Sequence, residues 1–361
     1  MGSGSETRLS EEELSRSRHD PGVGPRISIV GIGGAGNKLL GSVIDAGGAV
    51  AGQCIAINTD RVQLARSLAQ NKVLLGEDIA SGRGAMGSVS LGRRAIQLSA
   101  HRVTSFVEES DMTIILVGFG GGTGTSAAPL VAQWARTQIK PVVAVVALPF
   151  THEREKRFIA LRGLKKMSEA CDCTIVVDNA VSPQTESDEG KERFADTTAV
   201  GTVRSISDAL SNLEPGVSKN VLRVMMQGSL AVACVRRLRP RENISTALIE
   251  SVRTPSSNLP LSNAQGAVLL HAGPVQLGPG QAAQMHEMIS SLAGHKLSFA
   301  YGSVASSSDP ILCTLLTGYD YRSSIVGFVE LLTDLYDLEY GEPSTQLQYP
   351  IEIPLYQLER P

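Results

Sequence analysis

The sequence predicts an α/β protein in which a doubly wound parallel sheet is followed by a long central helix and a second α+β domain. Three observations lead to this prediction. Over residues 26–180, β-branched apolar runs of strand length alternate with helical segments, a pattern typical of a parallel sheet covered on both faces. Residues 194–213 can form one uninterrupted helix. Beyond this helix the apolar runs return at a different spacing, which indicates another domain.

The expected elements follow from hydrophobic periodicity. In the first domain the expected strands are short apolar runs at 27–30, 54–57, 113–117, 142–148 and 174–177. The expected helices between them cover 37–47, 60–70, 90–109, 127–139 and 153–169. In the second domain we expect helices near 221–235 and 280–293 and strands at 266–271, 297–304 and 311–317.

Changes in composition suggest the domain boundaries. Residues 1–25 are rich in Ser, Glu, Arg and Gly and contain little to bury, so we expect a flexible tail there. The expected units that follow are a first domain at 26–192, a central helix with its following loop at 193–220, a second domain at 221–335 and a tail at 336–361.

The overall composition excludes several classes of protein. Hydrophobic residues make up 42% of the chain and aromatic residues 4%, so aliphatic side chains must form the core. A net charge of -3 shows no excess of basic residues of the kind that binds nucleic acid or an acidic membrane. The five scattered cysteines do not suggest a disulfide framework. No apolar run reaches the ~20 residues that a membrane span needs, and the N-terminus lacks a secretory signal. We therefore expect a cytoplasmic protein.

A first glycine cluster follows the expected strand at 27–30. Gly31, Gly33, Gly34 and Gly36 let backbone N–H groups approach an anion, and the next helix offers its positive end. Taken alone, this G-x-G-x-x-G spacing fits a nicotinamide-dependent dehydrogenase equally well. It also fits a tight strand-to-helix turn that binds nothing.

A second, denser cluster follows the expected strand at 113–117. Its residues are Gly120, Gly121, Gly122, Thr123, Gly124 and Thr125. Consecutive glycines and two threonine hydroxyls are suited to forming a nest of donors around a di- or triphosphate. So many glycines weaken a turn unless a ligand needs close approach to the backbone. The chain has no Gly-Lys-Ser/Thr sequence, so it is not a P-loop NTPase.

With these two loops the sequence resembles the FtsZ/tubulin family. The second cluster is similar to the tubulin signature loop, and the first to the first phosphate loop of FtsZ. Other segments occur in the family's order: 56–60 resembles its second loop, 81–85 its third loop, and 148–157 its ribose-binding segment. The segments 177–179 and 194–196 resemble its base-binding segments. The resemblance covers residues 26–320.

The resemblance implies a bound guanine nucleotide, GTP or GDP, with Mg²⁺ at its phosphates. The implied nucleotide-binding residues come from all these loops and are Gly33, Gly34, Ala35, Asn37, Asn58, Asp60, Gly84, Ala85, Gly120, Gly121, Gly122, Thr123, Gly124, Thr125, Glu153, Arg157, Asn179, Phe194 and Asp196. Thr123 and Thr125 would contact phosphate oxygens or the magnesium shell. Glu153 and Arg157 would contact the ribose or a phosphate.

The resemblance also assigns the guanine contacts. Asn37, Asn179 and Asp196 carry amide or carboxylate oxygens that can accept from the N1–H and the exocyclic amine of guanine. Phe194 would stack on the base, or belong to the core. The family has an Asn-Asp pair where this chain has Asp196-Thr197, so the alignment at Asp196 can slip by one position.

One segment departs from the family pattern. In FtsZ and tubulin, a loop after the central helix presents acidic residues to the γ-phosphate held by the next subunit. The corresponding residues here, 215–225, contain no Asp or Glu but include Lys219 and Arg223. A protonated basic side chain cannot act as a base toward water, and Asn220 is the candidate for positioning that water. We therefore predict slow or absent hydrolysis of GTP.

The resemblance implies a cytoskeletal protein that assembles head to tail into filaments, in cell division or in cell shape. The alternative is a non-hydrolysing GTP-binding scaffold or regulator that caps or copolymerises with another filament protein. The implied partners are further copies of the chain, with a membrane adaptor or a second filament protein in addition. We identify no adaptor-docking peptide in residues 336–361.

Overall fold

A computed structural model describes residues 25–47, 53–138, 140–181, 187–240, 242–306 and 310–321. The predicted tail at 336–361 lies outside these residues, and so does the predicted tail at 1–25 except for Pro25. In the described part of the chain, no helix is both long enough and apolar enough to cross a membrane.

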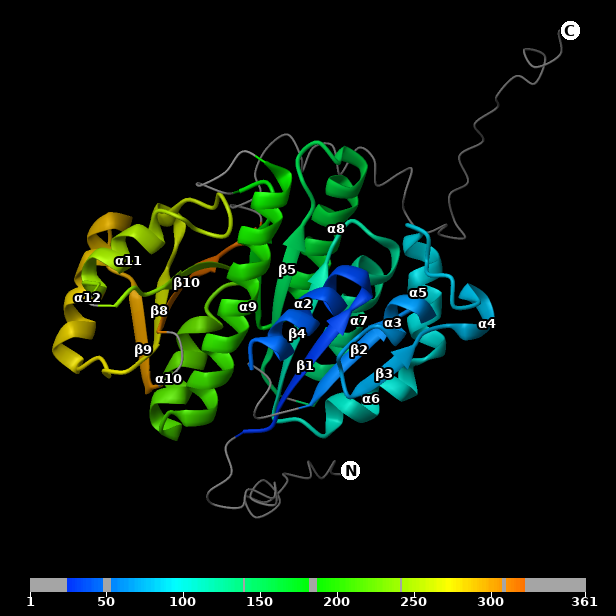
Figure 1. The fold of residues 1–361 in the computed structure, drawn as a ribbon, viewed down its shortest axis with the longest axis horizontal. Helices are drawn as coiled ribbons and strands as arrows, with labels where there is room; N and C mark the ends of the chain where they lie inside the picture. Colours follow the sequence, from blue (N-terminus) through cyan, green and yellow to red (C-terminus); the bar gives the residue numbers. More distant parts are fainter. Residues whose placement is uncertain are drawn as a thin grey trace, which may run out of the picture.

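Strands and helices alternate along the first half of the chain, as predicted (Figure 1). The strands are β1 (Ile27–Ile32), β2 (Cys54–Asn58), β3 (Asn71–Leu74), β4 (Met112–Gly118), β5 (Val142–Leu148), β6 (Cys173–Asp178), β7 (Leu230–Arg237), β8 (Gly266–Gly273), β9 (Ser298–Ala305) and β10 (Ile311–Tyr319). The helices are α2 (Gly33–Asp45), α3 (Arg61–Ala65), α4 (Glu77–Ala80), α5 (Val89–Leu98), α6 (Ala100–Glu108), α7 (Gly122–Arg136), α8 (Arg154–Ala170), α9 (Asp188–Asn212), α10 (Pro215–Met225), α11 (Ile244–Val252) and α12 (Pro279–Ala293), with a 3-10 turn η1 (Leu261–Asn263).

One continuous ten-stranded sheet runs through both domains in the order β3-β2-β1-β4-β5-β6-β7-β10-β8-β9. From β3 to β7 every neighbouring pair is parallel. β10 is antiparallel to both β7 and β8, whereas β8 and β9 are parallel. The second domain therefore extends the sheet of the first.

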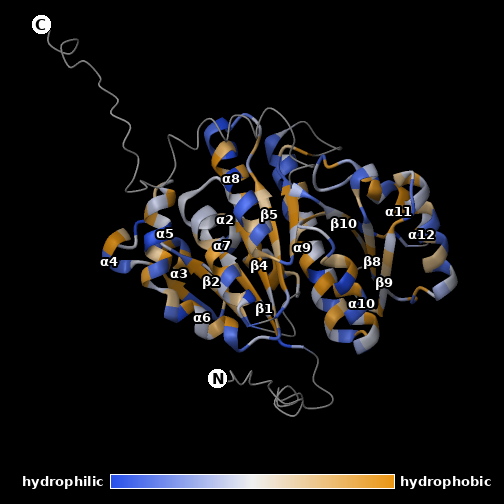
Figure 2. Ribbon diagram, turned by 180° about the vertical axis from the view of Figure 1, so that it is seen from behind, coloured by the Kyte–Doolittle hydropathy of each residue, from blue (hydrophilic) through white to orange (hydrophobic). Residues whose placement is uncertain are grey.

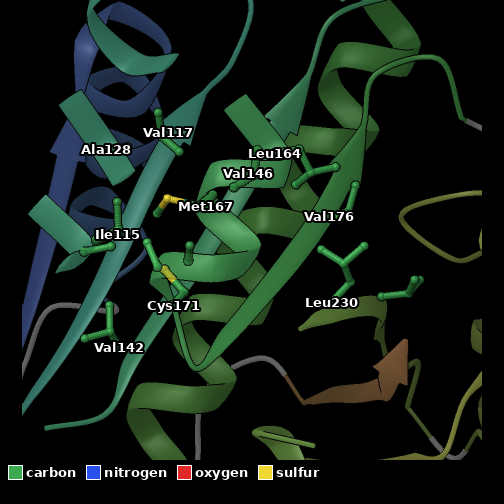
Figure 3. Packing of buried hydrophobic residues seen from close by; sticks show 14 of the residues in the cluster. Ile115, Val117, Ala128, Val142, Val146, Leu164, Met167, Cys171, Val176 and Leu230 are labelled. Atoms are coloured by element: carbon green, nitrogen blue, oxygen red, sulfur yellow. The ribbon is translucent and has the colours of Figure 1, made fainter. Parts of the chain in front are cut away.

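Helices cover the sheet on both faces. On one face, α2, α9 and α10 bury aliphatic side chains such as Leu40 and Val203 against the strands. On the other face, α5 to α8 cover the first domain, and α11 and α12 cover the second. Figure 3 shows Leu164 and Met167 of α8 packed near Val146 and Ile115 of the strands. Figure 2 shows the apolar strands between helices whose outer residues are polar.

The predicted fold class is confirmed: a doubly wound parallel sheet, a long central helix (α9) and a second α+β unit. The prediction of a helix over 221–235 was wrong in its second half. Residues 230–237 form β7, which lies between β6 and β10. A short, fully buried apolar run has no periodicity that distinguishes a strand from a buried helix. β3, α4 and α11 were not predicted.

Candidate nucleotide-binding site

Both glycine clusters lie at the same edge of the sheet. β1 and β4 are neighbours in the middle of the first six strands of the sheet (β3-β2-β1-β4-β5-β6), and the chain leaves them in opposite directions, toward β2 and toward β5. In a doubly wound sheet, ligands bind beyond the carboxyl ends of the strands at this switch point. α2 begins directly after β1 at Gly33, and α7 begins at Gly122, shortly after β4. The fold thus brings the two predicted phosphate loops together.

The two loops pack backbone against backbone. A Cβ atom on Gly33, whose φ is +74°, would lie 3.1 Å from the backbone nitrogen of Gly124. A Cβ atom on Gly124 would lie 2.6 Å from the carbonyl oxygen of Gly118. Side chains are therefore excluded here for steric reasons, and the peptide groups of both loops line a shared cradle.

Gly121 differs from these glycines. It is the N-cap of α7, it has extended backbone angles (φ -97°, ψ 168°), and no side chain caps the helix. A Cβ atom at this position would meet no atom within 4 Å. The first N–H groups of a helix lack intrahelical partners and attract anions. The open space at Gly121 is therefore where a phosphate group would fit.

The two threonine hydroxyls of the signature loop have partners within the protein. Thr125 Oγ1 accepts a hydrogen bond from the N–H of Gly120 at 2.9 Å. Thr123 Oγ1 lies 2.7 Å from Thr59 Oγ1, at the end of β2. These contacts fix the shape of the loop and join it to the second loop. Direct contact of Thr123 and Thr125 with phosphate or magnesium stays a prediction.

Asn58 and Asp60 shape the second loop. Asn58 Oδ1 accepts from the N–H of Asp60 at 3.2 Å, and its amide nitrogen donates to Gln63 Oε1 at 3.3 Å. Asp60 caps α3 by accepting from the N–H of Gln63 at 2.9 Å. Both predicted ligands thus already have roles in the turn, and their contact with the nucleotide stays a prediction.

The third loop lies against the other loops. The N–H of Gly84 donates to the carbonyl oxygen of Thr59 at 3.2 Å. A Cβ atom on Gly122 would lie 2.9 Å from Cβ of Ala85 and 2.6 Å from the carbonyl oxygen of Ser88. The predicted residues Gly84 and Ala85 are therefore held beside the cradle, next to the signature loop.

Asn37 has the features expected of a ligand-binding side chain. It is 6% exposed. Its amide nitrogen makes a long contact of 3.5 Å to the carbonyl oxygen of Ile57, and its Oδ1 atom has no partner among the described residues. An unpaired buried acceptor costs ~1–3 kcal/mol. A donor on a bound base would remove that cost. Gly34 and Ala35 precede Asn37 by three and two residues, in the first turn of α2.

The predicted ribose-binding residues make strong contacts within the protein. Arg157 donates to both carboxylate oxygens of Asp178, at 2.7 and 2.6 Å, and to the carbonyl oxygen of Pro149 at 2.6 Å. Glu153 lies 2.6 Å from Lys156, and this ion pair lowers the pKa of the Glu153 carboxyl group. The geometry favours Arg157 as a brace between the ends of β5 and β6 over a direct nucleotide ligand.

The last predicted base contacts lie around the start of α9. Asn179 follows β6, and its N–H donates to the carbonyl oxygen of Leu148 at 3.2 Å. Asp196 lies 2.9 Å from Lys38 of α2. Phe194 and Asp196 line a cavity of about 640 Å³ between α2, α9 and the end of β7. None of the glycine loops lines this cavity, so this cavity does not bring Phe194 or Asp196 together with the phosphate cradle, and their contact with the base stays a prediction.

The predicted loop after the central helix is instead a helix. Only Leu213 and Glu214 separate α9 from α10, which begins at Pro215. α9 has 25 residues and, at ~1.5 Å per residue, spans about 37 Å. α10 therefore lies at the far end of α9 from the glycine loops (Figure 1). Asn220 is on α10, and its Oδ1 accepts from Arg223 at 2.9 Å. It cannot reach its own chain's phosphate cradle.

Some residues of this region were not predicted as part of the site. Thr59 joins two loops, Asp178 holds Arg157, and Lys38 holds Asp196. Each acts through a partner that is distant in the sequence, so no local pattern indicates its role. Among the described residues, no group of three or more His, Cys, Asp or Glu side chains could hold a metal ion.

A doubly wound sheet with two glycine cradles at its switch point defines a nucleotide-binding class of fold. The sequence matches the GTPase domain of the Tubulin/FtsZ family over residues 26–182. It is 30% identical over 287 residues to the cell division protein FtsZ 1 of Pyrococcus horikoshii, covering 75% of this chain and 76% of that protein. FtsZ 1 of Pyrococcus furiosus is 30% identical over 301 residues, with coverages of 81% and 79%.

Solved structures agree with these matches. An FtsZ structure from M. jannaschii has a TM-score of 0.73 and 27% identity, covering 82% of this chain and 92% of that one. A GTPγS-bound protofilament of CetZ2 from Haloferax volcanii has a TM-score of 0.70 at 20% identity, with coverages of 87% and 99%, and indicates a shared fold. The chain belongs to the Tubulin/FtsZ family. Membership of this GTPase family implies that it binds GTP or GDP.

Proposed function

We propose that this protein binds GTP between successive subunits and assembles head to tail into filaments, with weak or absent hydrolysis, in cell division or cell shape. The observation that carries the proposal is the separation of the two ends of α9. The glycine cradle lies near one end, and α10, which has no Asp or Glu, begins beyond the other, about 37 Å away. A cytoplasmic location and Mg²⁺ at the nucleotide phosphates are parts of the same proposal.

Relatives support the filament part of this proposal. A similar M. jannaschii protein is described as an FtsZ dimer, and the CetZ2 neighbour as a protofilament. A head-to-tail contact joins two different surfaces, so it generates an open filament rather than a closed dimer. In such a contact, α10 of one subunit would face the nucleotide of the next and would offer it Lys219 and Arg223 instead of carboxylates.

Assembly is expected to require GTP and to show a critical concentration. The nucleotide fills the cradle that forms half of the contact, so its γ-phosphate should strengthen the contact. Light scattering over a concentration series measures the critical concentration. Negative-stain microscopy in GTP, in GDP and without nucleotide shows whether filaments form in each condition. Filaments with GTP above a threshold concentration support the proposal; particles that stay monomeric at every concentration contradict it.

GTP should bind more tightly than ATP by roughly 5- to 150-fold. Asn37 and Asp196 would accept hydrogen bonds from the N1–H and the exocyclic amine of guanine, and adenine has no donors at these two positions. Asn37 offers a buried Oδ1 without a protein partner, which an adenine ring would leave unpaired. Calorimetric titration with GTP and with ATP measures the ratio of the two affinities. Equal affinities would contradict the assignment of Asn37 and Asp196 as guanine contacts.

A second function has one observation in its favour. α10 offers no carboxylate for hydrolysis. The same feature fits a non-hydrolysing GTP-binding scaffold or regulator that caps or copolymerises with another filament protein. The scattering series separates the two proposals. A self-assembling protein shows a critical concentration alone, whereas a regulator changes the assembly only of its partner.

A further inference from the structure

We propose that residues 322–361 of this chain bind back across α8 of the same chain, so that an acidic segment covers a basic helix face. This contact involves no bound nucleotide and is separate from the proposed function. An acidic partner that binds α8 would first have to displace this segment.

The basic surface is the outward face of α8. This helix contains six basic and two acidic residues. Four of its residues follow one another at four-residue intervals and so share one face of the helix: Arg154, Phe158, Arg162 and Lys166. Arg154 and Lys166 are exposed, as is the adjacent Lys165, whereas Phe158 and Arg162 are half-buried. The face therefore offers positive charge together with an aromatic side chain.

The basic residues of α8 differ in how far their charge is already paired. Arg157 is bound to the buried carboxylate of Asp178. Arg154 and Lys165, in contrast, form no ion pair with any other residue that the structure describes. These exposed cations can therefore accept a carboxylate from a further segment without giving up a partner.

Residues 322–361 carry the complementary charge. They contain seven acidic residues and only two basic ones, Arg322 and Arg360, and no Lys, Arg or His stands between these two arginines. Five of the acids fall within residues 330–342, where leucine and tyrosine side chains separate them. An acidic stretch with apolar side chains matches a helix face formed by arginine, lysine and phenylalanine, in charge and in apolar contact.

The described chain ends directly on α8. The hydroxyl of Tyr321, the last described residue, donates to the carbonyl oxygen of Leu161 at 3.1 Å. Leu161 lies near the middle of α8, which has 17 residues and, at ~1.5 Å per residue, spans about 25 Å. Residues 330–342 follow Tyr321 by 9 to 21 positions, and an extended residue spans up to ~3.3–3.6 Å, so they can reach either end of α8. A tether this short gives an effective concentration in the millimolar range, which favours the same chain over a second copy.

Energy transfer from the single tryptophan to a label on the segment tests this contact in the full chain without nucleotide. Trp134 lies on α7, and two residues further Arg136 donates to the carbonyl oxygen of Glu169 at the end of α8, at 3.1 Å. The five native cysteines are buried, so a thiol-reactive fluorophore labels only the cysteine introduced by Ser344→Cys. We expect efficient transfer at ~0.1 M salt and a loss of about half of it at ~1 M, because the Debye length falls from ~10 to ~3 Å.

Charge reversal on α8 should release the segment. Lys165→Glu with Lys166→Glu should lower the transfer efficiency by about two-fold or more, because like charges would then face each other. Adding Asp334→Lys with Asp337→Lys should restore the efficiency, since opposite charges again face each other. This restoration also shows that the first variant is folded.

Lys72→Glu with Lys296→Glu is the matched control. It makes the same change in net charge at exposed positions in β3 and beside β9, the two outer strands of the sheet, and should leave the transfer efficiency unchanged. Low transfer in the protein without charge reversals overturns the contact. So does a loss that is equal in the α8 variant and in this control, or absent from both.

An excess of unlabelled protein distinguishes the two sources of the segment. Transfer within one chain is unaffected by the excess and supports the proposal. If the segment instead binds α8 of another copy, unlabelled segments compete for the surface and the transfer efficiency falls. Such a fall overturns the assignment to the same chain.

Discussion

Replacing Gly121 by valine is expected to abolish nucleotide binding while the fold persists. Gly121 has extended backbone angles that valine adopts readily, and a Cβ atom there meets nothing within 4 Å. The valine would therefore fit the protein alone but occupy the space at the N-terminus of α7. Losing two hydrogen bonds to a charged phosphate costs ~3–6 kcal/mol, which lowers the affinity roughly 100-fold or more. Titration with GTP measures the loss.

Gly278→Val is a matched control for this variant. Gly278 is also a helix N-cap with extended angles (φ -77°, ψ 162°) and open space at Cβ, and it precedes α12 in the second domain. Each substitution should cost about 1 kcal/mol of helix capping, so both should lower the unfolding temperature by a similar, small amount. Only Gly121→Val should lose GTP. Normal GTP binding by Gly121→Val would show that the phosphate lies elsewhere.

Gly122 is a less informative position for the same test. Its Cβ atom would lie 2.6 Å from the carbonyl oxygen of Ser88 and 2.9 Å from Cβ of Ala85. A side chain at Gly122 would displace the third loop, so lost binding would not distinguish a blocked phosphate site from a disturbed loop. Adjacent glycines in one loop thus serve different purposes. One makes room for the neighbouring loop, and the other leaves room for a ligand.

The parts of the site that the sequence predicted are those formed by local backbone. Two glycine clusters, each between a β-branched run and a helix, sufficed to place both phosphate loops at one sheet edge, because parallel strands end on the same side. Asn37 was predicted by its position in the first of these loops. Its unpaired Oδ1 atom depends on its burial beside β2, which only the folded chain supplies.

The parts that sequence reasoning could not predict are pairings between distant residues. Lys38 and Glu192 are 154 positions apart, and Arg157 and Asp178 are 21 apart. Long charged side chains form ion pairs across the fold only after the helices and strands that carry them have packed together. Arg157 was predicted as a ligand of ribose or phosphate from the resemblance of residues 148–157 to the family's ribose-binding segment, whereas the fold pairs it with a carboxylate that is almost fully buried.

α10 shows how one signal can indicate opposite structures. A proline after a helical pattern is typical of the end of a helix, and the sequence prediction placed a loop after the central helix, over residues that include Pro215 and Gly216. Proline is also favoured at the first position of a helix, because its missing N–H would have no partner there. α9 does end at Asn212, but Pro215 begins the next helix directly. In the proposed filament, this end of the molecule would therefore offer its neighbour a helix N-terminus rather than a flexible loop.

GTP in assembled filaments is expected to remain largely triphosphate over many minutes. General-base assistance to an attacking water is worth roughly 100- to 10,000-fold in rate, and α10 supplies no carboxylate for that role. Asn220, the remaining candidate for orienting water, has its Oδ1 atom engaged by Arg223 at 2.9 Å. Chromatography of the nucleotide extracted from pelleted filaments measures the ratio of GTP to GDP.

Carboxylates placed on α10 should restore turnover if this helix faces the next subunit's γ-phosphate. Val217 is 36% exposed and stands in the first turn, where a negative charge also stabilises the helix. Val217→Asp with Asn220→Asp should raise phosphate release by up to roughly 100-fold. Adding Arg223→Gln should raise it further, since Arg223 would otherwise pair with the new aspartate. The gain should depend on protein concentration, because the carboxylates act on a neighbouring subunit.

Val275→Asp is the control for this variant. Val275 is 71% exposed and lies outside α10, so this substitution should leave the rate of phosphate release unchanged. Rapid, concentration-dependent phosphate release by the unmodified protein would contradict the prediction that hydrolysis is slow because α10 lacks carboxylates. Release that Asn220→Ala eliminates would also contradict it, since the amide would then perform the role assigned to the missing carboxylates.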